Sequence, residues 1–275
     1  MSDVAAYTAR RLQRIAEDAL ATAGVLGVLP TPLEALRPVA GIRAVEPIPT
    51  LPERIRTPGR RLLGALWFDE RTIFLEEEQS EARRRFTEAH ELMHALCPWH
   101  EAALREDTSD ELFRAAVDQI EAEANLGAGM LLFQGRHFAG RAASERPSIS
   151  AALTLAREYG ASAHAALHHY VLTHAAALAL LVVGRFPRRD GSLPVWRSVE
   201  SLRYRKRYAP ATAAIPGGLL QDSPLRELVE AARRSSEPAV AGLPWPDAGG
   251  GLRRVRAEAH YNRHAFLVLL EAPDG

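Results

Sequence analysis

The residue types best suited to chemistry lie in one short stretch, His90-Glu91-Leu92-Met93-His94. At about 100° per residue, His94 lies only about 40° around a helix from His90, so both imidazoles can reach one metal ion. The stretch has the H-E-x-x-H pattern, in which the histidines bind Zn²⁺ and the glutamate serves as general base. We therefore assign His90 and His94 as zinc ligands and Glu91 as the base.

The surrounding sequence predicts the helix that must carry this motif. Ser80 can cap its first turn and Pro98 can end it. Between them, apolar side chains recur at three- and four-residue steps, at Phe86, Ala89, Met93 and Leu96. Upstream, residues 62–68 and 72–75 predict a β-hairpin, one strand of which could hold an extended peptide by backbone pairing.

A catalytic zinc ion takes three protein ligands, so one more donor is required. His100 follows His94 at the spacing of the H-E-x-x-H-x-x-G-x-x-H pattern, but Cys97 stands where that pattern has glycine. Glycine there lets the chain turn with positive φ, which a side chain resists. The alternative donor is Glu121, beside the apolar stripe of a second long helix predicted after Thr108-Ser109-Asp110. Spacing alone leaves both donors open.

Length and composition bound the class of protein. A chain of 275 residues with 47% hydrophobic residues can form one large or two modest globular domains. Its longest apolar run, residues 175–183, is about half of a membrane span, and its N-terminus does not have the pattern of a signal peptide. Cys97 is the only cysteine, which excludes an intrachain disulfide. We expect a cytoplasmic protein with no membrane partner.

Periodicity along the chain predicts an α+β fold. The N-terminal part is expected to hold a helix at 4–23, a short helix from Thr31-Pro32 and strand fragments within 41–58. The C-terminal part is expected to hold strands at 178–186, 195–205, 252–260 and 265–271, with a helix at 224–233. Basic residues exceed acidic ones from 176 onward.

Between these parts, residues 148–175 predict a helix, a turn at Tyr159-Gly160 and a second helix, the cadence of a helix-turn-helix unit. The second helix offers alanine and histidine where base-reading helices offer arginine, asparagine or glutamine, so we favour a packing role. We interpret its histidines as core or surface residues rather than a second metal site; they are His164, His168, His169 and His174.

A longer pattern resembles a known family. Arg84-Arg85-Phe86-Thr87-Glu88-Ala89-His90-Glu91-Leu92-Met93-His94, followed by Glu121-Ala122-Glu123-Ala124-Asn125 and the leucine-rich residues 127–132, is similar to the ImmA/IrrE metallopeptidases. The likeness is strongest over residues 60–135 and implies that His90, His94 and Glu121 bind Zn²⁺, with Glu91 as general base. The chain departs from the family at Phe133-Gln134, where Met-Pro is common, and we expect this to alter loop shape rather than chemistry.

The resemblance also implies a three-part layout. A mainly helical zinc-peptidase domain with a small β-sheet is expected at 1–145, a helix-turn-helix-like segment at 146–175 and a GAF-like α+β sensor domain at 176–275.

In function, the resemblance implies a site-specific endopeptidase that cleaves a helix-turn-helix repressor of the XRE type after DNA damage or phage attack. The similar CapP subgroup accompanies anti-phage operons and responds to single-stranded DNA. The alternative is a DNA-binding transcription regulator on a peptidase-derived scaffold with a structural metal. Glu91 favours the enzyme, because a structural site needs no base. A small-molecule sensor lacks a cofactor fingerprint in this sequence.

Two further hypotheses concern regulation. Cys97 follows His94 by three residues and could act as an inhibitory metal ligand, the alternative being a buried small apolar residue. In the second, cations alternate with aromatic rings that could contact single-stranded DNA, at Arg203, Tyr204, Arg205, Lys206, Arg207 and Tyr208. If that stretch is a strand, its odd-numbered arginines share one face.

Overall fold

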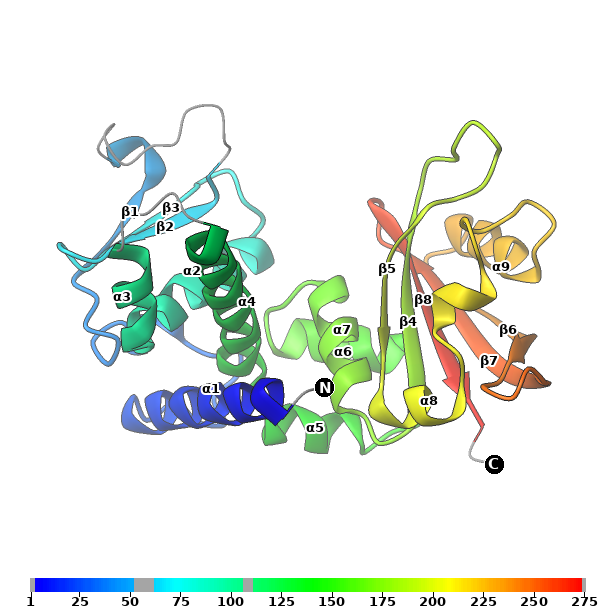
Figure 1. Cartoon of the computed structure of the whole chain (residues 1–275), viewed down its shortest axis with the longest axis horizontal. Coiled ribbons are helices and arrows are strands. Elements are labelled where there is room, and N and C mark those ends of the chain that lie inside the picture. Colours follow the sequence, from blue (N-terminus) through cyan, green and yellow to red (C-terminus); the bar gives the residue numbers. More distant parts are fainter. Residues whose placement is uncertain (1–2, 52–61, 106–110, 274–275) are drawn as a thin grey trace. The chain divides into compact units, whose positions relative to one another are not determined.

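The computed structural model describes residues 3–51, 62–105 and 111–273. By their contacts the residues form two compact units, one of residues 1–138 with 157–162 and one of 139–156 with 163–275. The first unit holds the H-E-x-x-H motif, and the second holds the C-terminal sheet (Figure 1).

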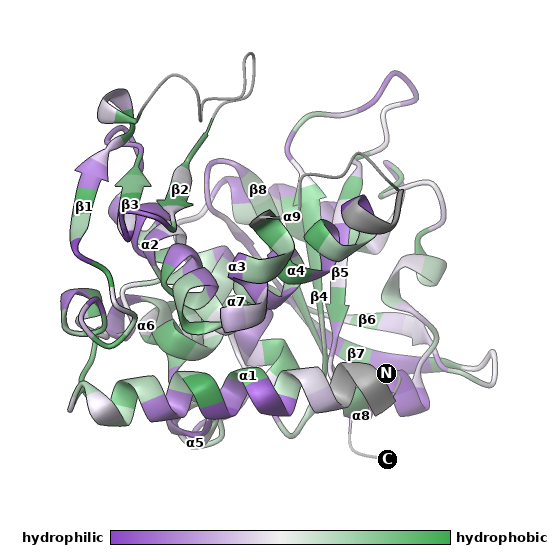
Figure 2. Cartoon of the chain, turned by 60° about the vertical axis from the view of Figure 1, so that its left-hand side comes forward, coloured by the Kyte–Doolittle hydropathy of each residue, from purple (hydrophilic) through white to green (hydrophobic). Residues whose placement is uncertain are grey.

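Four helices build most of the first unit: α1 (Asp3–Thr22), α2 (Glu81–Leu96), α3 (Pro98–Arg105) and α4 (Glu111–Phe133). Both α1 and α2 pack against α4 (Figure 1). Figure 2 shows hydrophilic and hydrophobic residues alternating along α1, and its buried residues Leu12, Ala16 and Leu20 recur at four-residue steps. One stripe of α1 therefore belongs to the core, as the sequence predicted.

The contact between α2 and α4 is close because α4 presents small residues. Ala124 and Ala128 are fully buried, and a Cβ added to Gly127 would lie 2.7 Å from Met93 Cγ of α2. No real Cβ fits at that distance, so glycine is what allows the two helices to approach. This approach sets the separation between the H-E-x-x-H motif on α2 and the acidic residues of α4.

A small sheet lies beside α2. It consists of β1 (Ala44–Pro47), β3 (Thr72–Leu75) and β2 (Gly64–Trp67) in that order, with β3 parallel to β1 and antiparallel to β2. The predicted hairpin is confirmed, and β2 contacts α2. Gln79 strengthens this contact by donating from Nε2 to the carbonyl of Leu63 at 2.8 Å. Short 3-10 turns occupy Leu33–Ala35 (η1) and Ile48–Thr50 (η2).

The second unit is organised by an antiparallel sheet in the order β5-β4-β8-β7-β6 (Figure 1). Its strands are β4 (Ala177–Gly184), β5 (Val195–Glu200), β6 (Ala239–Pro246), β7 (Leu252–Tyr261) and β8 (Ala265–Ala272). The amphipathic helix α9 (Pro224–Arg233) packs on β6 and β7, burying Leu225, Leu228 and Val229. A 3-10 turn, η4, spans Ala211–Ala214.

Three helices follow α4 and precede this sheet in the chain: α5 (Arg136–Ala142), α6 (Ile149–Glu158) and α7 (Ala163–Thr173). The predicted helix, turn and helix over 148–175 are thus present. In α7, Leu172 is the only exposed side chain. A helix that reads base edges needs several exposed polar side chains, so α7 has the burial pattern of a packing helix.

The local predictions differ from the structure at three places. The short helix predicted from Thr31-Pro32 is present as the 3-10 turn η1, but Thr31 does not cap it, and its hydroxyl donates instead to the carbonyls of Leu131 and Leu132. The strand predicted at 195–205 ends at Glu200, where Ser201 caps a new helix, α8 (Leu202–Arg207), by accepting from the amide of Tyr204. The sequence did not reveal β6, since it contains two prolines, which an edge strand tolerates. The cap predicted at 108–110 and part of the strand fragments, 52–58, lie outside the described residues.

Gln134 joins the end of α4 to the loop after α1. Its side chain accepts from the amide of Gly27 at 2.6 Å and donates to the carbonyl of Val28 at 2.9 Å and the hydroxyl of Thr31 at 3.0 Å. Its own amide donates to the carbonyl of Met130 at 2.9 Å, and its φ is +51°. Gln134 therefore fastens the loop after α1 to the end of α4.

We expect Gln134→Pro to destabilise the first unit strongly. Proline lacks the amide hydrogen, fixes φ near −65° and leaves buried loop groups unpaired, for a total cost of about 3 kcal/mol or more. Gln134→Asn tolerates positive φ but is too short to reach the loop, and should cost less. Thermal unfolding followed by circular dichroism would measure both, and a proline variant as stable as wild type would contradict this role for Gln134.

Candidate metal centre

Two helices bring the three predicted zinc ligands together. His90 and His94 lie one turn apart on the same face of α2, and Glu121 faces them from α4. Glu121 Oε2 lies 3.3 Å from His90 Nε2, Glu121 Oε1 lies 3.5 Å from His94 Nε2, and the two Nε2 atoms lie 3.1 Å apart. All three donor atoms fall within 4.8 Å of one another. Among the described residues, no other group of three such donors meets this condition.

The electrostatics of this cluster favour an anionic carboxylate beside two imidazoles. Hydrogen bonds from His90 and His94 hold the pKa of Glu121 far below its usual range. Burial lowers the pKa of His90, but the hydrogen bond to Glu121 and the nearby carboxylates outweigh it, so the net pKa is raised. An ionised carboxylate and two imidazole nitrogens form the His₂Glu donor set of catalytic zinc sites. The residues present therefore fit the metal that the motif implies.

Glu91 lies next to the cluster and is almost completely buried, with 7% of its surface exposed. Burial raises the pKa of its carboxyl, although His90 and His94 act in the opposite direction. The backbone of β2 approaches it closely, since a Cβ added to Gly64 would overlap Thr87 and lie 3.0 Å from Glu91 Oε1. Glycine at position 64 thus lets the strand lie directly against the base.

His100, the alternative third ligand, lies on the far side of His94. Its Nδ1 is 3.1 Å from His94 Nδ1, whereas the Nε2 atom of His94 faces Glu121. A donor on the Nδ1 side cannot share a metal with the Nε2 atoms, and His100 does not belong to the donor cluster. His100 contacts Glu123 at 3.2 Å instead, a partner that spacing along the sequence does not reveal.

Cys97 ends α2 and is fully buried, with its amide donating to the carbonyl of Met93. Burial raises the pKa of the thiol to about 12. Its sulfur does not lie within the 4.8 Å cluster of donors. This placement favours the alternative of a buried small side chain, and the inhibitory role stays a prediction.

The stretch proposed to contact nucleic acid forms α8 rather than a strand, so the predicted alternation of faces is wrong. Tyr204 is fully buried and Tyr208 nearly so; their rings stack at 5.0 Å, and Trp245 Nε1 donates to the hydroxyl of Tyr204. Neither ring is available for stacking on bases. The exposed cations of this stretch are Arg203, Arg205 and Lys206, and Arg207 is partly buried.

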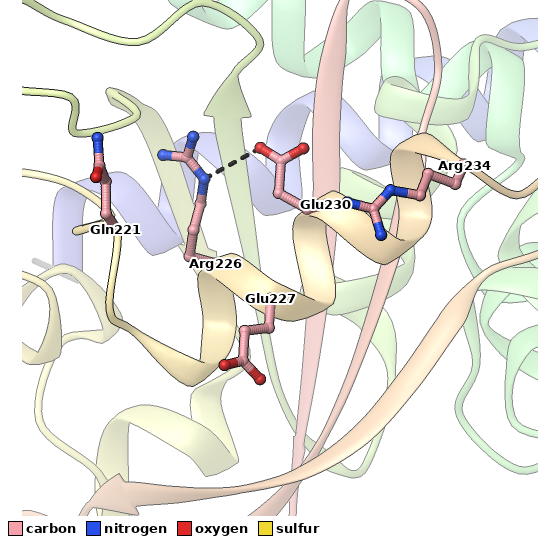
Figure 3. Close-up of a pocket in the computed structure, with 5 residues that line it drawn as sticks. All are labelled: Gln221, Arg226, Glu227, Glu230 and Arg234. Carbon is pink, nitrogen blue, oxygen red and sulfur yellow. Dashed lines mark hydrogen bonds and ion pairs between the residues drawn. The ribbon is translucent and has the colours of Figure 1, made fainter.

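A surface hollow in the second unit lies over α9 and contains none of the predicted site residues. It is lined by Gln221, Arg226, Glu227, Glu230 and Arg234 (Figure 3). Arg226 donates to Glu230 at 3.1 Å, so charges of this hollow already pair with each other.

A family model and several solved structures match this chain. Residues 53–170 match the model of the Peptidase_M78 family, described as the IrrE N-terminal-like domain. The fold is similar to a solved structure of a Mycobacterium tuberculosis transcriptional regulator, with a TM-score of 0.57 and 15% identity over 96% of this chain and 76% of that chain. A search of curated proteins finds no significant match. Within the described ranges, no helix is both long and apolar enough to cross a bilayer.

We expect Glu121→Ala to lose bound zinc, because two imidazoles alone hold the ion weakly. Asp118→Ala is the matched control, since Asp118 is an exposed carboxylate on the same helix. Metal content after gel filtration, measured by mass spectrometry, should show about one zinc per chain for wild type and the control. Full zinc occupancy in Glu121→Ala would reject Glu121 as a ligand.

Proposed function

We propose that the chain is a zinc-dependent, site-specific endopeptidase, on the premise that residues 53–170, which match the Peptidase_M78 model of IrrE N-terminal-like domains, make it a member of that family. Its substrate in this proposal is a helix-turn-helix repressor of the XRE type, whose cleavage derepresses a DNA-damage or anti-phage response in the cytoplasm. One observation carries the proposal: the donors His90, His94 and Glu121 converge, with a glutamate beside them in the position of a base.

When bound, zinc would polarise the scissile carbonyl and lower the pKa of water, so that water could lose a proton and attack the carbonyl at neutral pH. His90 and His94 would each give Nε2 to the ion, and Glu121 would give a carboxylate oxygen. The Glu91 carboxylate, one residue after His90, would accept the proton of the attacking water and return it to the leaving amine. These roles follow from the H-E-x-x-H arrangement on α2.

The edge of the small sheet supports a peptide substrate. Strand β2 pairs with β3 on one side only among the described residues, and Gly64 in β2 lies against Glu91. An extended segment pairing with that edge would run directly past the base. A helix-turn-helix repressor would have to offer such a segment from a loop or a locally unfolded stretch.

The alternative is a DNA-binding regulator with a structural metal. The helix-turn-helix arrangement of α6 and α7 would support this alternative, but Leu172 is the only exposed side chain in α7. A recognition helix reads bases with exposed arginine, asparagine or glutamine, none of which α7 contains. The burial of α7 therefore favours the peptidase.

Within this proposal, single-stranded DNA remains the expected activator, but its contact must be revised. Because Tyr204 and Tyr208 are buried, α8 can offer only charge to the phosphate backbone, through Arg203, Arg205 and Lys206. Such binding would tolerate sequence changes and weaken steeply with salt.

We expect Glu91→Gln to keep zinc and abolish repressor cleavage, because it preserves the size of the side chain and removes the base. Glu81→Gln, an exposed position at the start of the same helix, serves as the control. The measurement is cleavage of a purified XRE-type repressor, with zinc content determined on the same samples. Undiminished cleavage by Glu91→Gln would exclude its role as base, and a wild-type chain that cleaves nothing but binds operator DNA would support the regulator instead.

We expect replacement of Arg203, Arg205 and Lys206 together by glutamate to weaken single-stranded DNA binding at least tenfold at low salt, since phosphate contacts dominate such binding. The matched control replaces three other exposed arginines of the second unit by glutamate, Arg189, Arg234 and Arg254. Fluorescence anisotropy with a labelled oligonucleotide measures the affinity. Equal losses in both triple variants would show that net charge, rather than α8, determines binding.

A further inference from the structure

A buried chain of polar side chains continues from the metal centre into the core. His100 is fully buried, with Nδ1 3.1 Å from His94 Nδ1 and Nε2 3.2 Å from Glu123 Oε2. Glu123 also accepts from Trp99 Nε1 at 2.8 Å on Oε2 and from Gln119 Nε2 at 2.9 Å on Oε1. Both oxygens of this carboxylate are therefore hydrogen-bonded, and the chain runs from Glu123 through His100 to the ligand His94.

When His94 binds a metal, the hydrogen bonds among His94, His100 and Glu123 can run in only one donor-to-acceptor direction. Coordination through Nε2 requires a lone pair there, so the proton of the neutral ring is on Nδ1. His94 then donates from Nδ1 to His100 Nδ1, which accepts. The His100 proton is consequently on Nε2 and donates to Glu123.

The opposite direction is incompatible with metal binding. With a neutral His100 it would require a proton on Glu123 Oε2, an oxygen that accepts from Trp99 Nε1. It would also make His94 accept at Nδ1 and carry its proton on Nε2, the atom that faces Glu121. A ring in that tautomer cannot bind the ion.

We propose that His100 and Glu123 are positioning residues, which hold His94 in the tautomer and orientation that bind the metal. This inference rests on the proposed metallopeptidase function. Partners of this kind fix a ligand ring and increase its basicity, and their loss commonly weakens metal binding by about 10- to 100-fold.

The break between α2 and α3 explains how His100 reaches its place. Cys97 ends α2, Pro98 begins α3, and the amide of His100 donates to the carbonyl of Cys97 at 2.9 Å. Because of this turn, His100 lies against Nδ1 of His94 and not beside the donor atoms of the predicted metal ligands. Trp99 is fixed in turn by Arg11, whose guanidinium lies 3.6 Å from the ring centroid.

Two substitutions at position 100 separate a positioning role from mere packing. His100→Leu fills the space but offers no acceptor to His94, so the zinc dissociation constant should rise about 10- to 100-fold. His100→Asn places its Oδ1 where His100 has Nδ1, and should restore much of the affinity. Glu123→Gln keeps the shape and removes the charge, and should weaken zinc binding by an intermediate factor.

Zinc affinity is to be measured by competition with a chromophoric chelator, and thermal unfolding of the metal-free variants shows whether each one folds. Glu101→Gln is the control, because Glu101 is a carboxylate on the same helix as His100 and pairs with Arg71. Zinc affinity equal to wild type in His100→Leu and Glu123→Gln would overturn the proposal. So would an equal loss in Glu101→Gln, or no recovery in a folded His100→Asn variant.

Two-bond ¹H–¹⁵N correlation spectra of the zinc-loaded wild type give an independent readout. They should show the His100 proton on Nε2, with the signal assigned by its absence in His100→Asn; a proton on Nδ1 would overturn the proposed direction. Failure of the proposed function is recognised separately, as a wild-type chain that binds zinc in this manner but cleaves no repressor. If the wild type binds no zinc, both proposals fail.

Discussion

The metal centre depends on how closely α2 approaches α4. His90 and His94 are on one helix and Glu121 is on the other, so their separation is set by packing rather than by chain connectivity. Gly127 in α4 leaves the space that Met93, the neighbour of His94, fills. Interiors packed to crystal-like density transmit small displacements, and a side chain at position 127 would require the Met93 side chain or the two helices to shift.

The sequence predicted what local spacing determines and missed what tertiary packing determines. The pair His90 and His94 is a property of one helix, so its geometry follows from 3.6 residues per turn. Glu121 could be selected over His100 only by resemblance, because the angle of the chain after Cys97 and Pro98 is not encoded by spacing. That angle turns His100 toward Nδ1 of His94, and in this position His100 also contacts Glu123.

In the second unit, the residue pattern of a helix was interpreted as the two-residue alternation of a strand. Alternating cations and tyrosines suggested a strand, yet Ser201 caps a helix, and in a helix Tyr204 and Tyr208 are four residues apart on one buried face. Ser201 was the local signal for the start of a helix, but the alternation of cations and tyrosines after it favoured a strand. Strand β6 was missed for the opposite reason: its prolines argue against a strand unless that strand is known to lie at an edge.

The metal centre differs in exposure from one side to the other, and this difference bears on its use. The side chain of Glu121 is 47% exposed, whereas those of His90 and His94 are 14% and 4% exposed. The ligands are thus reachable on the α4 side and closed on the side of His100, where hydrogen bonds hold His94 in place. A structural zinc site has four protein ligands and is closed all round. Three donors, one of them on a half-exposed side chain, suit an ion that must meet a substrate, and Glu91 and Gly64 of β2 lie beside them.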